Sequence, residues 1–159
     1  MKNQYKTGFN FLKLYLERKY DVKVIQKSGA EDAWYPALNK IVINNDLQWR
    51  ERLLALMHES GHVQIDLENH IVKNMKCTGN FSEYIDSTKI RSKKQFINIL
   101  NEELMAWNLG KNLAISLNIQ FDNRKLEEIT TKCVMSYVKS GLKGIYGKRI
   151  DIDLIDSGL

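Results

Sequence analysis

Two histidines four residues apart stand near the middle of the chain, in the segment His58-Glu59-Ser60-Gly61-His62. On a helix, residues i and i+4 lie on one face, about 6 Å apart, so both imidazoles can bind the same Zn²⁺ ion. Glu59 projects about 100° away from His58 and, in a His-Glu-x-x-His pattern, acts as a general base and not as a ligand. Two of the chain's three histidines occupy the motif. The pattern therefore favours a hydrolytic zinc site over a helix whose histidines serve packing alone.

A catalytic zinc site needs a third protein ligand. The extended motif that would supply a third histidine is absent, because Ile65 stands at its glycine position and Glu68 at its last histidine position. The helix should continue through Ile65 and carry Glu68 away from the metal. Asp66, one turn beyond His62, is expected to support the site without binding the metal. His70 is expected to be exposed.

Two adjacent glutamates on a later helix, Glu102 and Glu103, are the candidates for the third ligand. Only one of two adjacent helical residues can face a given point. The helical neighbours of Glu103 are all apolar: Ile99, Leu100, Ala106 and Trp107. An acid within an apolar stripe is costly unless it is paired with a cation or a metal. We therefore predict Glu103 as the ligand, and the sequence leaves Glu102 as the alternative.

Hydrophobic periodicity defines the elements that must position these side chains. We expect helices over residues 4–19, 47–68, 94–117 and 123–138, and strands over 21–27, 33–36 and 41–44. Residues 71–92 should form a loop with room for one short helix. Residues 149–154 form either a terminal strand, a docking tail or a frayed end. Gly61 should let another segment approach the metal closely.

Turn and cap residues mark the ends of these elements. Pro36 limits its strand to an edge or a strand end. Asn45 or Asp46 can cap the motif helix, and Asp122 or Asn123 can open the last helix.

The order of these motifs resembles that of a minimal gluzincin, a zinc metallopeptidase of His-His-Glu type. In that group a later helix carries Glu-x-x-Ala, which Glu103-Leu104-Met105-Ala106 matches. Residues 5–118 are most similar to the ImmA/IrrE-type peptidases, which are often carried by phages and mobile elements and whose characterised members cleave repressors. The resemblance implies an α+β, zincin-like fold. A small antiparallel sheet would pack on the His-Glu-x-x-His helix, followed by the glutamate-bearing helix and a C-terminal helix.

The expected activity is hydrolysis of peptide bonds in a specific protein substrate, with Zn²⁺ held by three ligands: His58, His62 and Glu103. Glu59 would take the proton of the attacking water and pass it to the leaving amine. An extended substrate could pair with the strand at 41–44. Three tyrosines could supply an oxyanion donor, and the sequence does not choose among them: Tyr84, Tyr137 and Tyr146.

Composition bounds the class of protein. A chain of 159 residues, 43% hydrophobic and 27% charged, favours one globular domain over residues 1–159. No apolar run is long enough to cross a bilayer, and no signal-peptide hydrophobic region follows Met1. We therefore expect a cytoplasmic protein without membrane contact, in which Cys77 and Cys133 are reduced thiols.

The net charge of +5 permits contact with nucleic acid but does not favour it, because the charges are mixed along the chain. The basic stretches at 89–94 and 139–149 are expected to be solvated surface. Two alternatives to the peptidase are a non-catalytic zincin-fold regulator and a nucleic-acid-associated protein with a bound zinc. The oligomeric state is left open.

Overall fold

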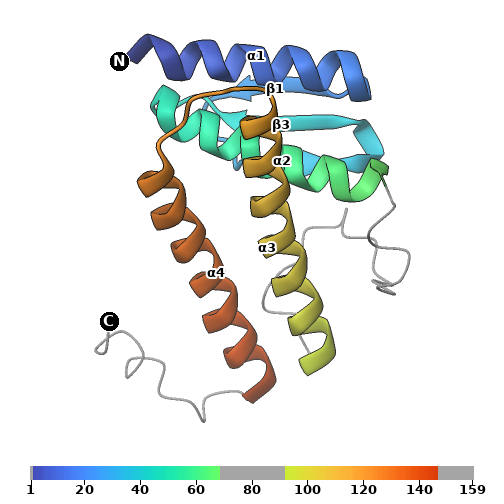
Figure 1. The fold of residues 1–159 in the computed structure, drawn as a ribbon. Coiled ribbons are helices and arrows are strands. Elements are labelled where there is room, and N and C mark those ends of the chain that lie inside the picture. Colours follow the sequence, from blue (N-terminus) through green and yellow to red (C-terminus); the bar gives the residue numbers. More distant parts are fainter. Residues whose placement is uncertain (1, 69–91, 147–159) are drawn as a thin grey trace.

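The computed structural model describes residues 2–68 and 92–146 (Figure 1). The element order is α1 (Lys2–Tyr20), β1 (Lys23–Lys27), β2 (Ala33–Tyr35), a 3₁₀ helix (Pro36–Leu38), β3 (Lys40–Asn44), α2 (Trp49–Glu68), α3 (Lys93–Ser116) and α4 (Asn123–Tyr146). The α+β class is confirmed. None of these helices combines the length and the apolar character needed to cross a bilayer. The expected loop at 71–92, apart from its last residue, and the expected strand or tail at 149–154 lie outside the described residues.

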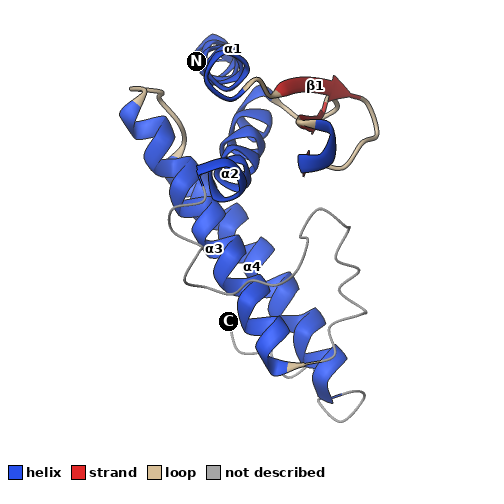
Figure 2. Ribbon diagram, turned by 90° about the vertical axis from the view of Figure 1, so that its right-hand side faces the viewer, coloured by secondary structure: helices blue, strands red, loops and turns tan. Residues whose placement is uncertain are grey.

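The helix α2 lies at the centre of the arrangement. It packs against α1, β2 and β3 on one side and against α3 on the other. Figure 2 shows α3 and α4 running together away from the α1 and sheet region. The core between α1, α2 and the sheet is formed by fully buried apolar side chains, among them Phe9, Leu12, Leu16, Ile41, Ile43, Leu53 and Met57. Both faces of α2 are therefore covered by protein over most of its length.

The three-stranded sheet is mixed, and the prediction of an antiparallel sheet is wrong. The strand order is β1-β3-β2; β1 pairs with β3 in parallel, and β2 pairs with β3 antiparallel. The chain leaves β1 through a turn at Gly29 (φ 65°), forms the far edge, and turns back at Asn39 (φ 44°) so that β3 enters between the first two strands. Ile41, Val42 and Ile43 are all buried, as a central strand requires.

The central position of β3 overturns a second expectation. Both of its edges are paired within the sheet, so it cannot bind a substrate by strand addition. Among the described residues, β2 is the edge strand on the side of the pocket described below.

The start of α2 differs from the prediction, whereas the start of α4 agrees with it. The carboxylate of Asp46 accepts hydrogen bonds from the Ser28 hydroxyl and the Gly29 amide, so it fixes a turn and does not cap α2, which begins at Trp49. Asp122 does cap α4, because its Oδ1 accepts from the Lys125 amide at 2.9 Å.

The helix α4 also extends beyond the predicted end at residue 138, to Tyr146. Gly141 allows this extension to pack, because a Cβ atom there would lie 2.2 Å from the ring of Phe96 on α3. Tertiary contact with α3 thus outweighs the low helix propensity of glycine.

The helices α2 and α3 cross with their backbones in contact. A Cβ atom at Gly61 would lie 1.9 Å from the carbonyl oxygen of Ala106, and one at Gly110 would lie 1.9 Å from the carbonyl oxygen of Met57. Gly61 thus admits a second segment, α3, close to the motif helix. No side chain larger than hydrogen fits at either position unless the helices separate.

Alanine at either glycine should therefore force the two helices apart. We expect Gly61→Ala and Gly110→Ala each to lower the free energy of unfolding by at least about 2 kcal/mol, because overpacking against a backbone cannot be relieved by a rotamer change. Gly144→Ala, at an exposed position of α4, is the matched control and should leave stability unchanged or raise it by up to about 1 kcal/mol. Urea unfolding followed by circular dichroism measures all three. Equal stabilities for Gly61→Ala and Gly144→Ala would refute the backbone contact.

Candidate metal centre

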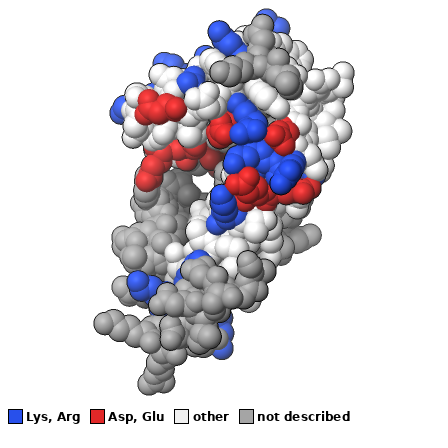
Figure 3. All heavy atoms as spheres, turned by 90° about the vertical axis from the view of Figure 1, so that its left-hand side faces the viewer, with Lys and Arg blue, Asp and Glu red and all other residues white. Residues whose placement is uncertain are grey.

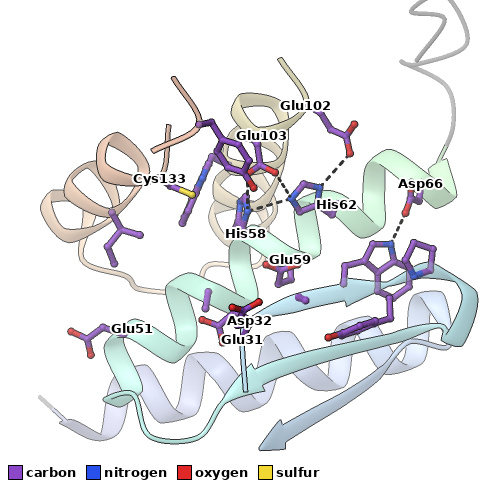
Figure 4. A pocket seen from close by; sticks show the side chains of 18 of the residues that line it. Glu31, Asp32, Glu51, His58, Glu59, His62, Asp66, Glu102, Glu103 and Cys133 are labelled. Carbon is purple, nitrogen blue, oxygen red and sulfur yellow. Dashed lines mark hydrogen bonds and ion pairs between the residues drawn. The ribbon is translucent and has the colours of Figure 1, made fainter. Parts of the chain in front are cut away.

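The structure brings together the three residues predicted as metal ligands: His58 and His62 on α2, and Glu103 on α3 (Figure 4). The two imidazole Nε2 atoms are 3.3 Å apart. Glu103 Oε2 lies 3.3 Å from His58 Nε2, and Glu103 Oε1 lies 3.6 Å from His62 Nε2. Glu103 stands one turn before Ala106, where α3 meets Gly61, so the helix crossing sets its distance from both histidines.

These atoms lie close enough to bind one metal ion. Ligand atoms at 2.0–2.1 Å from a tetrahedral metal are about 3.3–3.4 Å from one another, close to the three distances observed. Glu103 is nine-tenths buried, with 9% of its surface exposed, and its Oε2 has no hydrogen-bond partner. A buried carboxylate whose two oxygens face two imidazole nitrogens is an environment that a cation satisfies. The donor set suits zinc, and imidazole also suits other transition metals.

Neighbouring side chains support both histidine rings. The ring of His58 stacks on the indole of Trp107, with centroids 4.2 Å apart and an interplanar angle of 22°. The Nδ1 atom of His62 faces Glu102 Oε1 at 3.7 Å. Glu103 thus faces both Nε2 atoms while Glu102 supports one ring from its other side. The choice between the adjacent glutamates follows the helix phase.

Other acidic residues near the motif have different partners from those expected. The role of supporting carboxylate, expected of Asp66, belongs to Glu102, because Asp66 accepts a hydrogen bond from the indole of Trp34 at 2.5 Å. Glu68 points away from the site, as predicted, and binds Lys19 Nζ at 3.0 Å and the Tyr20 hydroxyl. His70 lies outside the described residues.

Burial and the neighbouring imidazoles act on the pKa of Glu59 in opposite directions. Burial raises the pKa of the Glu59 carboxyl, and the nearby positive charge of His58 and His62 lowers it only in part. The negative charges of Glu103 and Asp32 add to the rise in its pKa. Glu59 is thus a carboxylate with raised affinity for a proton, buried beside the histidines at 5% exposure.

In two of the predicted ligands, His62 and Glu103, neighbouring charges outweigh the effect of burial on the pKa. Burial lowers the pKa of His62, but the interaction with Glu102 and the charges of Glu59 and Glu103 outweigh it and raise the pKa to about 9. Burial raises the pKa of Glu103, but the contact with His58, the charges of both histidines and the Tyr137 hydroxyl outweigh it and lower the pKa. The pKa of Glu103 is therefore one that keeps the carboxylate ionised for a cation.

A pocket of about 570 Å³ opens onto this triad. It is lined by β2 on one side, by α2 along its length, and by Ile129, Cys133 and Tyr137 of α4. Burial and the charge of Glu103 raise the pKa of Tyr137, so its hydroxyl remains protonated and can donate. Of the three tyrosines considered, Tyr84 and the side chain of Tyr146 lie outside the described residues.

Cys133 is a free cysteine that also lines the pocket. Burial raises the pKa of its thiol to about 11, and the charge of Glu103 contributes to that rise. It is therefore a neutral thiol at physiological pH. Cys77 lies outside the described residues.

Comparison with known protein families, with curated proteins and with solved structures finds no match for this chain. The function proposed below is therefore inferred from the geometry and chemistry of the pocket alone. Two residues of the site were not predicted from the sequence: Trp107 as the support of His58, and Trp34 as the partner of Asp66. Trp107 could have been predicted, because it lies one helical turn beyond Glu103. Trp34 could not, because it is far from Asp66 in the chain.

The two adjacent glutamates should differ in their effect on metal binding. Glu103→Ala removes a ligand and should weaken Zn²⁺ binding by more than about 100-fold, whereas Glu102→Ala removes only a supporting carboxylate and should cost about tenfold. Zinc competition against a chromogenic chelator measures both affinities. Zinc should also raise the unfolding temperature of Glu102→Ala more than that of Glu103→Ala. Loss of zinc from Glu102→Ala together with retention by Glu103→Ala would reassign the ligand.

Proposed function

We propose that this protein is a zinc-dependent peptidase of the gluzincin type, similar to the ImmA/IrrE group. His58, His62 and Glu103 would hold the zinc, and Glu59 would act as the base. The single observation that carries the proposal is the triangle of two Nε2 atoms and one carboxylate, with edges of 3.3–3.6 Å, at the base of an open pocket. Three protein ligands leave a coordination position open, which is typical of catalytic zinc and not of structural zinc.

Zinc, when bound, supplies Lewis-acid chemistry that polarises a carbonyl and acidifies water. The chain's own residues would move the protons. Glu59 accepts a proton from the attacking water, a role that suits its raised pKa, and then gives a proton to the leaving amine. The oxygen of water adds to the carbonyl carbon, the C–N bond breaks, and a carboxylate and an amine result.

The edge strand β2 would orient the substrate. Its three residues, Ala33, Trp34 and Tyr35, all line the pocket. An extended peptide that adds to a sheet edge gains backbone hydrogen bonds whatever its sequence. The hydrogen bond from Trp34 to Asp66 ties this strand to the end of α2 and so fixes the distance between the edge and the triad.

Tyr137 would stabilise the oxyanion that develops on the carbonyl. It is the one of the three tyrosines considered whose side chain is described in the pocket, and its hydroxyl interacts with Glu103. A neutral hydroxyl beside the metal ligands is a suitable donor to a developing negative charge.

A nucleic-acid role at this site has less support, because acidic side chains line the pocket and would repel phosphate. A non-catalytic regulator would use the same fold without needing the buried Glu59. We propose one specific protein as the substrate, and the ImmA/IrrE resemblance favours a regulator such as a repressor.

Replacing the base should separate metal binding from hydrolysis. Glu59→Gln should lower the rate of peptide hydrolysis by at least about 100-fold, because it removes the proton acceptor. The same variant should retain about one zinc per chain, since no ligand changes. Cleavage is measured by mass spectrometry of peptide mixtures, and zinc by elemental analysis. Equal cleavage by the variant and the wild type would rule out Glu59 as the base.

Removing the Tyr137 hydroxyl should slow turnover while leaving substrate binding intact. We expect Tyr137→Phe to lower kcat by about 10- to 100-fold with little change in KM, because the donor acts on charge that develops only in the transition state. Tyr35→Phe, another pocket tyrosine, is the control and should retain kcat within about twofold. A raised KM with unchanged kcat in Tyr137→Phe would contradict the assignment.

A further inference from the structure

The pocket is acidic although the chain is basic. The chain has 24 Lys and Arg against 19 Asp and Glu. Of the described residues that line the pocket, none is Lys or Arg, and seven carry carboxyl groups: Glu31, Asp32, Glu51, Glu59, Asp66, Glu102 and Glu103. On the face drawn in Figure 3, basic and acidic side chains lie next to one another. Lys125 and Lys132, for example, both pair with Glu128. The pocket lining therefore differs in charge from this mixed surface.

The carboxyl groups flank the metal triad on both sides. Glu51 lies near the start of α2 and Asp66 near its end, with the two histidines between them (Figure 4). Fifteen helical residues span about 22 Å. That length corresponds to about six or seven residues of an extended peptide, at roughly 3.3 Å per residue. Glu31 and Asp32 lie together beside the middle of this span, just before β2.

The donors to Asp32 and Asp66 orient these two carboxylates without cancelling their charge. Asp32 accepts from the Asn44 amide at 2.6 Å, and Asp66 accepts from the neutral indole of Trp34. Glu51 Oε1 pairs with Arg50 at 3.3 Å, but Glu51 Oε2 is buried without a hydrogen-bond partner. Neutral donors fix a carboxylate and leave its negative potential directed at the pocket.

Burial, apart from charge, also marks the pocket as a ligand site. Glu103 is nine-tenths buried, its Oε2 has no hydrogen-bond partner, and its two oxygens face His58 and His62. A bound Zn²⁺ would offset two negative charges and Arg50 offsets that of Glu51, whereas Asp32 and Asp66 are held by neutral donors and keep their charge. A cleft of one sign with low-dielectric walls focuses its potential on whatever enters it.

We propose that this pocket selects cationic peptide segments, with Lys or Arg side chains within about three residues of the scissile bond, and excludes acidic segments. The inference rests on the proposed peptidase function and names its substrate class. The carboxylates of Asp32, just before β2, and Asp66, near the end of α2, receive the cationic side chains. Like charges brought together at such a site are strongly disfavoured, so an acidic peptide is rejected as firmly as a basic one is accepted.

Binding to an inactive, zinc-loaded protein tests the preference without requiring hydrolysis. Glu59→Gln protein is titrated into three fluorescent octapeptides that differ only at two positions, which hold Lys, Gln or Glu. Fluorescence anisotropy should show the Lys peptide binding about tenfold more tightly than the Gln peptide, and the Glu peptide binding most weakly. The advantage of the Lys peptide should shrink as salt is raised from about 50 to 500 mM.

A matched pair of double variants in the Glu59→Gln background locates the effect. Asp32→Asn with Asp66→Asn should reduce the preference for the Lys peptide by about fivefold, while each amide keeps an acceptor oxygen for its donor from Asn44 or Trp34. Glu17→Gln with Glu127→Gln removes the same charge on α1 and α4, outside the pocket lining, and should leave the preference unchanged. Thermal unfolding of both double variants checks that each retains its fold.

Equal binding of the three peptides, tighter binding of the Glu peptide, or no binding of any peptide would overturn the inference. Incubation of the zinc-loaded wild type with the Lys peptide reports separately on the peptidase proposal. Selective binding without cleavage would contradict the peptidase and leave the cationic preference standing. Cleavage of all three peptides at equal efficiency would support the peptidase and overturn the preference.

Discussion

The backbone contact between α2 and α3 is the constraint on which the site depends. Gly61 and Gly110 let the two helices approach until the carbonyls of Ala106 and Met57 occupy the space where side chains would be. Glu103 and Trp107 flank Ala106 on α3, and His58 is one turn before His62 on α2. The close crossing therefore places both the carboxylate of Glu103 next to the Nε2 atoms and the indole of Trp107 against the face of His58. Cofactor and catalytic positioning on rigid helices is more precise than positioning on loops.

Much of this site could be predicted from the sequence, because its signals are local. The i, i+4 spacing of His58 and His62 places both on one helical face, and the helix phase separates Glu103 from Glu102. The cap at Asp122 was equally readable, since the interaction spans three residues. The chain's own backbone geometry decides each of these features.

The remainder depends on contacts between distant segments. The strand order β1-β3-β2 requires β3 to enter between two earlier strands. The residue pattern within the strands does not determine which strands become neighbours. Asp46 could have capped α2, but it binds a turn 17 residues away, at Gly29. The extension of α4 past Gly141 likewise depends on Phe96 of α3. The acidity of the pocket is of the same kind, because its carboxylates come from the segment before β2, from α2 and from α3, and the basic composition of the whole chain conceals it.

The central claim is that two histidines and one glutamate form an open zinc site. X-ray absorption at the zinc edge, on protein loaded with one equivalent of Zn²⁺, tests it most directly. The account predicts four nitrogen and oxygen ligands at about 2.0–2.1 Å, with the outer scattering of two imidazoles and no sulfur. A sulfur ligand at about 2.3 Å would place Cys133 or Cys77 on the metal and contradict the account. The spectrum of hydrated zinc would show that no site exists.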